Sequence, residues 1–218
     1  MVDNQLFELF KKIKKRNESS SEGSEPFMIV GLGNPGREYE QNRHNIGFMA
    51  ADYLIEKYDF SGKKVKSKAI VTDGLRSGNK VVIVKPQTYM NLSGEAVGAL
   101  VRFYKIPLKN LVIIHDDLDL PFGVLRIRPG GGAGGQKGVN SIIQHLSDKE
   151  FNRFRIGIGR PPGRMVAADY VLQNFSTAEK EEIPFLLETV YKAMDVFLTD
   201  GINAAMNQFN GTAQAEGG

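Results

Sequence analysis

The sequence predicts an α/β protein: a single-domain, three-layer α/β/α sandwich with a twisted mixed central sheet. Short runs rich in β-branched residues alternate along the chain with longer runs in which apolar residues recur every three or four positions, and this alternation is typical of α/β folds. A chain of 218 residues that is 41% hydrophobic is long enough to bury one substantial core. Two adjacent strand-like runs, 69–73 and 81–85, are separated by a Gly-containing turn, so part of the sheet should be antiparallel.

The expected elements follow from the spacing of apolar residues and from the Gly and Pro residues between them. In chain order, the expected strands are 28–32, 69–73, 81–85, 111–115, 124–128 and 154–159. The expected helices are 45–58, 94–104, 138–146 and 179–198. No internal repeat is visible, so these elements should form one sheet with its covering helices.

Polar segments flank the predicted domain, which we place at residues 27–211. Residues 17–26 are rich in Ser and Glu and offer no apolar group to bury, so they predict a flexible linker. Between residues 6 and 16, apolar side chains recur at helical spacing beside five lysines and arginines, which predicts a short basic amphipathic segment. We therefore expect a flexible N-terminal extension over 1–26 and a disordered tail over 212–218.

The composition excludes several classes of protein. Cysteine is absent, which excludes a disulfide framework, a thiolate zinc site and a cysteine nucleophile. No run of about 18 apolar residues occurs, so we expect no membrane span and a cytoplasmic protein. The net charge is +3, yet residues 121–164 carry eight basic side chains against two acidic ones. That segment is either an ordinary solvated face or a surface for a polyanion.

The first polar motif, Gly31 to Gly36, follows a predicted strand and matches the dinucleotide-binding pattern GxGxxG. We interpret the match as accidental. The pattern should open a helix that receives a pyrophosphate, whereas polar residues 37–43 intervene here, and no acidic residue ends a second strand about 20 residues on. The glycines would instead form a tight loop at the carboxyl edge of the sheet that presents Asn34 to a cleft, unless Asn34 is merely a turn residue.

A candidate catalytic histidine, His44, follows that loop, and a carboxylate that could orient it lies at the end of the fourth predicted strand. Side chains alternate along a strand, so His115 and Asp116 should face opposite sides of the sheet. We choose Asp116 as the partner of His44 and regard His115 as structural. A divalent ion held by His44, Asp116, Asp117 and Asp119 is the alternative, but neither HExxH nor EF-hand spacing is present, and we expect no metal.

Two further polar tracts precede predicted helices. In the tract before residue 94, Asn91 either caps the helix or recognises a peptide backbone, with the ring of Tyr89 packing beside it. The tract 130–138 is Gly-rich and lacks the ending of a P-loop. It is either a flexible surface loop or a phosphate site in which backbone N–H groups and Lys137 bind the anion.

The motifs occur in a fixed order along the chain: residues 30–36 (VGLGNPG), 43–45 (RHN), 85–91 (KPQTYMN), 115–121 (HDDLDLP) and 155–159 (RIGIG). Together they resemble the motifs of the bacterial peptidyl-tRNA hydrolase family, and the likeness extends over residues 28–210. Several separate motifs in one order are far more specific than any one of them.

The resemblance implies a monomeric α/β enzyme without cofactor that hydrolyses the ester between a peptide and the 3'-terminal ribose of tRNA. It implies that His44 is the general base, that Asp116 orients it, and that Asn34 belongs to the catalytic set. Residues matching the family's substrate-contacting positions are Tyr39, Tyr89, Asn91 and Lys137. The cations expected to bind tRNA phosphates are Arg126, Arg128, Arg155 and Arg164, together with Lys137.

The sequence departs from the commoner family pattern after the double glycine, where Gln136-Lys137-Gly138 stands in place of His-Asn-Gly. Either the charge of Lys137 substitutes for the amide of that asparagine, or another group takes over its role. The alternatives to an esterase are a non-enzymatic RNA-binding relative of the same fold and a peptidase on a similar scaffold. The presence of His44 and Asp116 disfavours the first, and the basic segment disfavours the second.

Overall fold

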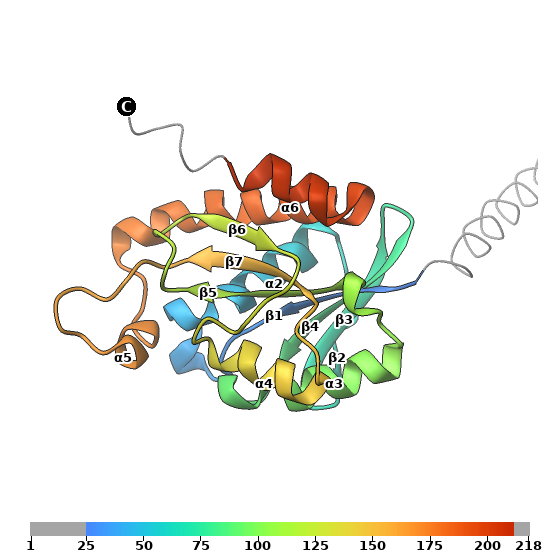
Figure 1. Ribbon diagram of the computed structural model, residues 1–218, viewed down its shortest axis with the longest axis horizontal. Helices are drawn as coiled ribbons and strands as arrows, with labels where there is room; N and C mark the ends of the chain where they lie inside the picture. Colours follow the sequence, from blue (N-terminus) through green and yellow to red (C-terminus); the bar gives the residue numbers. More distant parts are fainter. Residues whose placement is uncertain (1–24, 212–218) are drawn as a thin grey trace, which may run out of the picture.

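The structure is a computed structural model that describes residues 25–211, and over this range the chain forms the predicted α/β sandwich (Figure 1). The predicted basic amphipathic segment and the C-terminal tail lie outside the described residues. The strands are β1 (Phe27–Gly31), β2 (Lys64–Lys66), β3 (Ala69–Arg76), β4 (Asn79–Pro86), β5 (Leu111–Asp117), β6 (Leu125–Arg128) and β7 (Asn152–Gly157). The helices are α2 (Ile46–Lys57), α3 (Ser93–Tyr104), α4 (Lys137–Leu146), α5 (Ala167–Val171) and α6 (Thr177–Phe209). Short 3-10 turns are η1 (Arg37–Tyr39), η2 (Arg43–Asn45), η3 (Met90–Leu92) and η4 (Leu108–Asn110).

The sheet is mixed, as the sequence predicts. Within the described residues its seven strands run in the order β2-β3-β4-β1-β5-β7-β6. The central strands β4, β1, β5 and β7 are parallel to one another, whereas β2, β3 and β6 pair antiparallel at the two edges. The carboxyl ends of the parallel strands therefore meet at one edge of the sheet, where α/β proteins place their sites.

Helices cover both faces of the sheet and enclose two apolar cores. Along β5, Val112 and Ile114 join the core under α2 and α6, whereas Leu111 and Ile113 join the core under α3 and α4. This alternation follows from the two-residue period of a strand. Figure 1 shows α6 on one side of the sheet with α3 and α4 on the other.

Helix α2 packs unusually close to the sheet at Gly47. A Cβ atom at Gly47 would lie 2.4 Å from the carbonyl oxygen of Ile114 and 2.5 Å from that of Leu32. Only glycine allows this approach, because any side chain would overlap the main chain of the neighbouring strand ends. The close contact brings η2, which directly precedes α2, against the carboxyl end of β5.

The sequence prediction missed the shortest and most exposed elements. Strand β2 spans three residues with exposed side chains at Lys64 and Val65 and therefore lacks an apolar pattern. Helix α5 has five residues, and α6 continues beyond the expected end at residue 198, passing a non-helical residue at Gly201. The interpretation of the GxGxxG match agrees with the structure, since η1 and η2 separate β1 from α2.

The end of α6 covers an edge of the sheet. The side chain of Asn210 accepts a hydrogen bond from the main-chain N–H of Ile127 in β6 (2.7 Å) and donates one to its carbonyl oxygen (3.0 Å). This amide satisfies main-chain groups that an edge strand otherwise exposes. Between residues 25 and 211, no helix has both the length and the hydropathy needed to cross a bilayer.

Candidate active site

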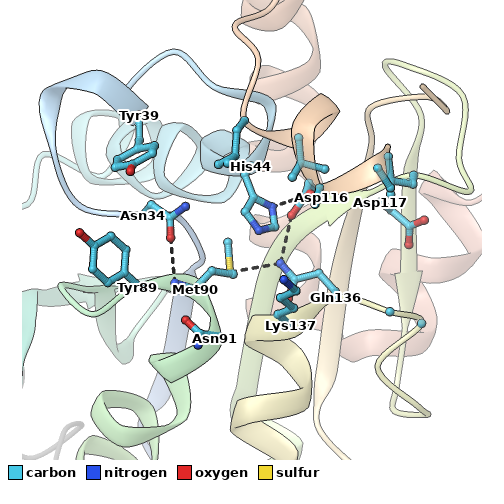
Figure 2. A pocket seen from close by; sticks show the side chains of 17 residues that line it. Asn34, Tyr39, His44, Tyr89, Met90, Asn91, Asp116, Asp117, Gln136 and Lys137 are labelled. Carbon is cyan, nitrogen blue, oxygen red and sulfur yellow. Dashed lines mark hydrogen bonds and ion pairs between the residues drawn. The ribbon is translucent and has the colours of Figure 1, made fainter. Parts of the chain in front are cut away.

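A pocket of about 660 Å³ opens at the carboxyl edge of the parallel strands. Seven residues that the sequence predicts as catalytic or substrate-binding line it: Asn34, Tyr39, His44, Tyr89, Asn91, Asp116 and Lys137. The remaining lining residues are Met90, Asp117, Leu118, Gly134, Gly135, Gln136, Ala167, Ala168, Val171 and Leu172. Loops after β1, β4 and β5, the start of α4, and α5 thus enclose one cavity (Figure 2).

The centre of the pocket is a hydrogen-bonded pair formed by His44 and Asp116. The Nδ1 atom of His44 lies 2.8 Å from Oδ2 of Asp116, whose side chain is only 3% exposed. An ionised carboxylate can only accept hydrogen bonds, so this contact places the proton of the neutral imidazole on Nδ1. The Nε2 atom of His44 then carries a free lone pair and can accept a proton.

The side-chain amide of Asn34 is held in one orientation. Its Oδ1 accepts a hydrogen bond from the main-chain N–H of Met90 (2.8 Å). The main chain of Asn34 is fixed as well, because its N–H donates to Oδ1 of Asn45 and its carbonyl oxygen accepts from Nδ2 of Asn45. The Nδ2 group of Asn34 therefore remains as the donor, and Figure 2 shows it on the side of the amide that faces His44.

The second oxygen of the Asp116 carboxylate is also bound. Oδ1 accepts a hydrogen bond from Nε2 of Gln136 (3.0 Å), and Oε1 of Gln136 accepts from the main-chain N–H of Val139 (2.8 Å). Gln136 is the N-cap residue of α4. The sequence identified Gln136 only as a departure from the commoner pattern, since its contact with a residue 20 positions away is not readable from spacing.

Three side chains line the outer part of the pocket. Tyr39 lies in η1 and is partly buried, whereas Tyr89 is 58% exposed. Asn91 lies exposed in η3, and the interpretation of Asn91 as a helix cap is wrong, because the N-cap of α3 is Leu92 and no side chain caps it. The sequence also missed the wall formed by α5, whose small and apolar residues Ala167 and Val171 face the cavity.

The predicted phosphate-binding arginines lie outside the pocket. Arg126 in β6 is opposite Arg155 in β7, on the face of these strands away from α6, and Nε of Arg155 pairs with Oδ2 of Asp117 at 2.5 Å. Arg128 and Arg164 are exposed, the latter in the connection between β7 and α5. The structure therefore links Arg155 to the pocket residue Asp117 and places Arg126 and Arg128 along the neighbouring strand β6, while Arg164 lies on a separate loop.

A buried arginine holds the Gly-rich tract in place by hydrogen bonds to its main chain. The guanidinium of Arg153, in β7, donates hydrogen bonds to the carbonyl oxygens of Gly131 and Gly132. The last two residues before Gln136, Gly134 and Gly135, have positive φ values of 57° and 82° and line the pocket. Glycine tolerates this left-handed region, so the tract reaches the start of α4 in a tight turn.

The groups of the alternative metal set have other partners. Asp117 pairs with Arg155 and Asp119 pairs with Arg160, each at 2.5 Å. No group of three or more potential ligands of these types gathers within residues 25–211. His115 faces away from His44, its Nδ1 lies 2.7 Å from the carbonyl oxygen of Asp116, and burial lowers its pKa below the ordinary 6.5. His115 and Asp116 therefore lie on opposite faces of β5, as the strand alternation predicts.

Comparison with known proteins identifies the family. The sequence model described as peptidyl-tRNA hydrolase matches residues 28–217. The chain is 52% identical over 184 residues to the peptidyl-tRNA hydrolase of Carboxydothermus hydrogenoformans and 49% identical over 185 residues to that of Chloroflexus aggregans, covering 84% of this chain and 98% of each relative. The crystal structure of peptidyl-tRNA hydrolase from Acinetobacter baumannii superposes with a TM-score of 0.81 at 36% identity, covering 87% of this chain and 98% of that one. The chain belongs to the peptidyl-tRNA hydrolase family.

Proposed function

We propose that this protein hydrolyses peptidyl-tRNA, cleaving the ester bond between the peptide and the 3'-terminal ribose. The family membership supports the reaction. The observation that carries the assignment of the site is the hydrogen bond between His44 and Asp116 inside the pocket, beside the fixed amide of Asn34. The predicted fold and family are confirmed by the comparisons, whereas the residue roles below are proposals.

His44 acts as the general base. Its Nε2 accepts a proton from a water molecule as the water oxygen attacks the ester carbonyl carbon, and Asp116 stabilises the imidazolium through the Nδ1–H bond. The tetrahedral intermediate then collapses, the bond to the ribose oxygen breaks, and His44 returns the proton to that oxygen. The products are a tRNA with a free ribose hydroxyl and a peptide carboxylic acid, which ionises by releasing its proton to solvent.

Asn34 stabilises the developing charge. Because its Oδ1 is bound by the main-chain N–H of Met90, the amide presents a donor to the substrate. A donor fixed in advance beside the base suits the carbonyl oxygen that becomes negative in the tetrahedral intermediate. The low exposure of Asn34, 8%, strengthens that interaction because little water competes for it.

The peptide binds along the outer part of the pocket. The rings of Tyr39 and Tyr89 provide flat apolar contact, and the amide of Asn91 can pair with main-chain groups of any peptide. The α5 wall, which includes Ala167 and Val171, adds apolar surface without hydrogen-bonding groups. Such a lining favours many peptides and does not depend on one side chain, which suits an enzyme acting on incomplete peptides.

The tRNA binds through its phosphates. Lys137 is exposed at the first residue of α4 and lines the pocket, so its charge adds to that of the helix N-terminus beside a terminal phosphate. Arg126, Arg128 and Arg155 extend the positive surface along β6 and β7, and Arg164 adds a contact from the loop before α5. These contacts would supply affinity without sequence reading.

We propose that the protein acts as a monomer without cofactor, which its membership of the peptidyl-tRNA hydrolase family supports. We also propose a cytoplasmic location, which the absence of cysteine and the nature of the substrate support.

The direct test is release of the amino-acid product from N-acetyl-aminoacyl-tRNA by the purified protein, with and without a metal chelator. We expect N-acetyl-amino acid and intact tRNA, at a rate that the chelator leaves unchanged. Binding of tRNA without release of product would contradict the hydrolase and support the second candidate, a non-enzymatic RNA-binding relative, which the basic face of β6 and β7 would also serve.

A further inference from the structure

Gln136 is a buried amide whose hydrogen-bonding groups all have partners. The residue is 8% exposed. Its Oε1 accepts from the main-chain N–H of Val139, and its Nε2 donates to Oδ1 of Asp116 and to the sulfur of Met90 (3.2 Å). A buried amide with this set of bonds is fixed in place, because rotating it would leave polar groups unpaired at a cost of about 1–3 kcal/mol each.

The orientation of the Gln136 amide follows from its surroundings. The N–H of Val139 can only donate, so the oxygen of Gln136 must face the helix. The nitrogen must then face Asp116, which as a carboxylate can only accept. The start of α4 thus selects which end of the amide meets the catalytic carboxylate.

The two oxygens of Asp116 have different partners, His44 on Oδ2 and Gln136 on Oδ1 (Figure 2). A carboxylate held by a single hydrogen bond can rotate about its Cβ–Cγ bond, whereas two bonds in different directions fix its plane. The plane of the Asp116 carboxylate in turn sets the direction of the His44 imidazole. The amide achieves this without adding a charge beside the base.

We propose that Gln136 is a positioning residue: it fixes the Asp116 carboxylate, and through it the His44 base, by tying them to the N-terminus of α4. The inference deepens the proposed function and rests on it, because it concerns the same base. It also explains how the site can keep its geometry with Gln136 where the commoner pattern has histidine. An amide does not ionise, so this support is the same at every pH at which the enzyme is folded.

Two substitutions separate the bond from Gln136 to Asp116 from the cap that Gln136 forms on the N–H of Val139. Gln136→Met is of similar volume and removes both the bond to Asp116 and the cap of α4. Gln136→Glu keeps an oxygen for the N–H of Val139 but places a second carboxylate against Oδ1 of Asp116. Asn210→Ala is the matched control, because it removes two bonds from a side-chain amide to the main chain of β6, outside the pocket.

Three results are expected from steady-state kinetics on N-acetyl-aminoacyl-tRNA. Gln136→Met lowers kcat by about ten- to a hundredfold and leaves KM within about threefold, since a displaced base slows the chemical step more than binding. For Gln136→Glu, the ratio of variant to wild-type kcat falls as the pH rises from about 6 to about 9. The reason is that a proton shared by the two carboxylates restores the bond at low pH and is lost at high pH. Asn210→Ala lowers thermal stability and leaves kcat unchanged.

If Gln136 only stabilised the fold, its substitutions would change neither kcat nor the pH dependence of kcat. The proposal is overturned if Gln136→Met keeps kcat within about threefold of wild type, or if the Gln136→Glu ratio is flat across that pH range. If Gln136→Met does not fold, the pH dependence of Gln136→Glu decides alone, because that variant retains the helix cap. Wild-type enzyme is measured in parallel. If the wild type hydrolyses the substrate and the Gln136 variants do so at the same rate, only the positioning role is rejected. If the wild type does not hydrolyse the substrate, the proposed function is rejected.

Discussion

At the scale of single residues, hydrogen bonds within the protein determine which polar groups of the pocket are left to react with a substrate. Asn34 cannot offer its oxygen freely to a substrate, because the main-chain N–H of Met90 occupies it. Asp116 has both carboxylate oxygens bound, and His44 has Nδ1 bound. Among Asn34, His44 and Asp116, the groups that remain for the substrate are one donor, Nδ2 of Asn34, and one acceptor, Nε2 of His44, which is the pair that water attack on a carbonyl requires.

Asn34→Asp tests the donor. The substitution keeps the size of the side chain and an oxygen for Met90, but it replaces the amide donor with a negatively charged acceptor. We expect kcat to fall by at least about a hundredfold, as when one oxyanion-stabilising donor is removed, and single-turnover kinetics measures it. Asn203→Asp, exposed in α6, controls for the added charge. An Asn34→Asp variant with nearly normal kcat would show that the donor is another group.

A substitution at Lys137 tests whether the lysine, which stands where the commoner family pattern has asparagine, affects binding or the chemical step. We expect Lys137→Asn to weaken tRNA binding by a few fold through loss of a phosphate contact and to change kcat by less than about tenfold, since the proposed base and donor are untouched. Binding is measured at several salt concentrations and kcat at saturating tRNA. A gain of several hundredfold in rate would show that the lysine impairs an amide-dependent step.

At the scale of elements, Arg43 connects η2, the turn that carries His44, to the α5 wall of the pocket. It lies in η2 beside His44, its guanidinium stacks on the ring of Tyr170 at 4.4 Å, and it donates to the carbonyl oxygen of Asn174 and to Glu179 at 2.6 Å each. The contacts fix the segment between α5 and α6 against η2. The α5 wall of the pocket and the position of His44 thus both depend on one buried side chain.

The Glu179 carboxylate makes this junction sensitive to acid. Burial raises its pKa, but bonds from Ser176 and the charge of Arg43 outweigh burial, so the pKa lies below the ordinary 4.5. A carboxylate with a lowered pKa stabilises the folded state above its unfolded pKa and loses that contribution as the pH falls through the folded value. We expect Glu179→Gln to be less stable than wild type at neutral pH and the difference to shrink on acidification below about 4.5. Urea unfolding over this pH range measures the difference, and a constant gap would contradict the assignment.

The helices and strands also show which parts of the fold can be predicted from the sequence. Strand β5 and helix α3 were predicted to within a few residues, because buried apolar residues recur there with a clear period. Strand β2 and helix α5 were not, since one is exposed and the other has five residues. The sequence pairs His44 with Asp116 because that carboxylate ends a buried strand, and the family resemblance implies the same pair. The contact of Gln136 with Asp116 depends on how α4 meets β5, which no local pattern encodes.

At the scale of the whole molecule, one ion pair connects the pocket to the arginines of β6 and β7. The edge strand β6 and its neighbour β7 place Arg126 and Arg155 in register on one face, and Asp117 links Arg155 to the pocket. We expect a nucleic acid bound along this face to reach the pocket beside Asp117. Long-range attraction by such a surface should make binding strongly dependent on salt.

The double substitution Arg126→Ala, Arg128→Ala tests the basic surface. We expect weaker tRNA binding, a plot of log K against log salt whose slope is smaller by about two, and an unchanged kcat at saturation, because each arginine contributes about one phosphate contact. Lys192→Ala, exposed on α6 and away from this face, is the control. An unchanged slope would place the tRNA on another surface.

The most direct test of the whole account is the single-turnover rate of ester hydrolysis by His44→Ala, with enzyme in excess over N-acetyl-aminoacyl-tRNA. His145→Ala, a histidine exposed on α4 outside the pocket, serves as the matched control. We predict that His44→Ala lowers the rate by at least about a hundredfold while tRNA binding and the rate of His145→Ala stay close to wild type. A His44→Ala enzyme that binds tRNA and hydrolyses the ester at nearly the wild-type rate would contradict the role of His44 as general base.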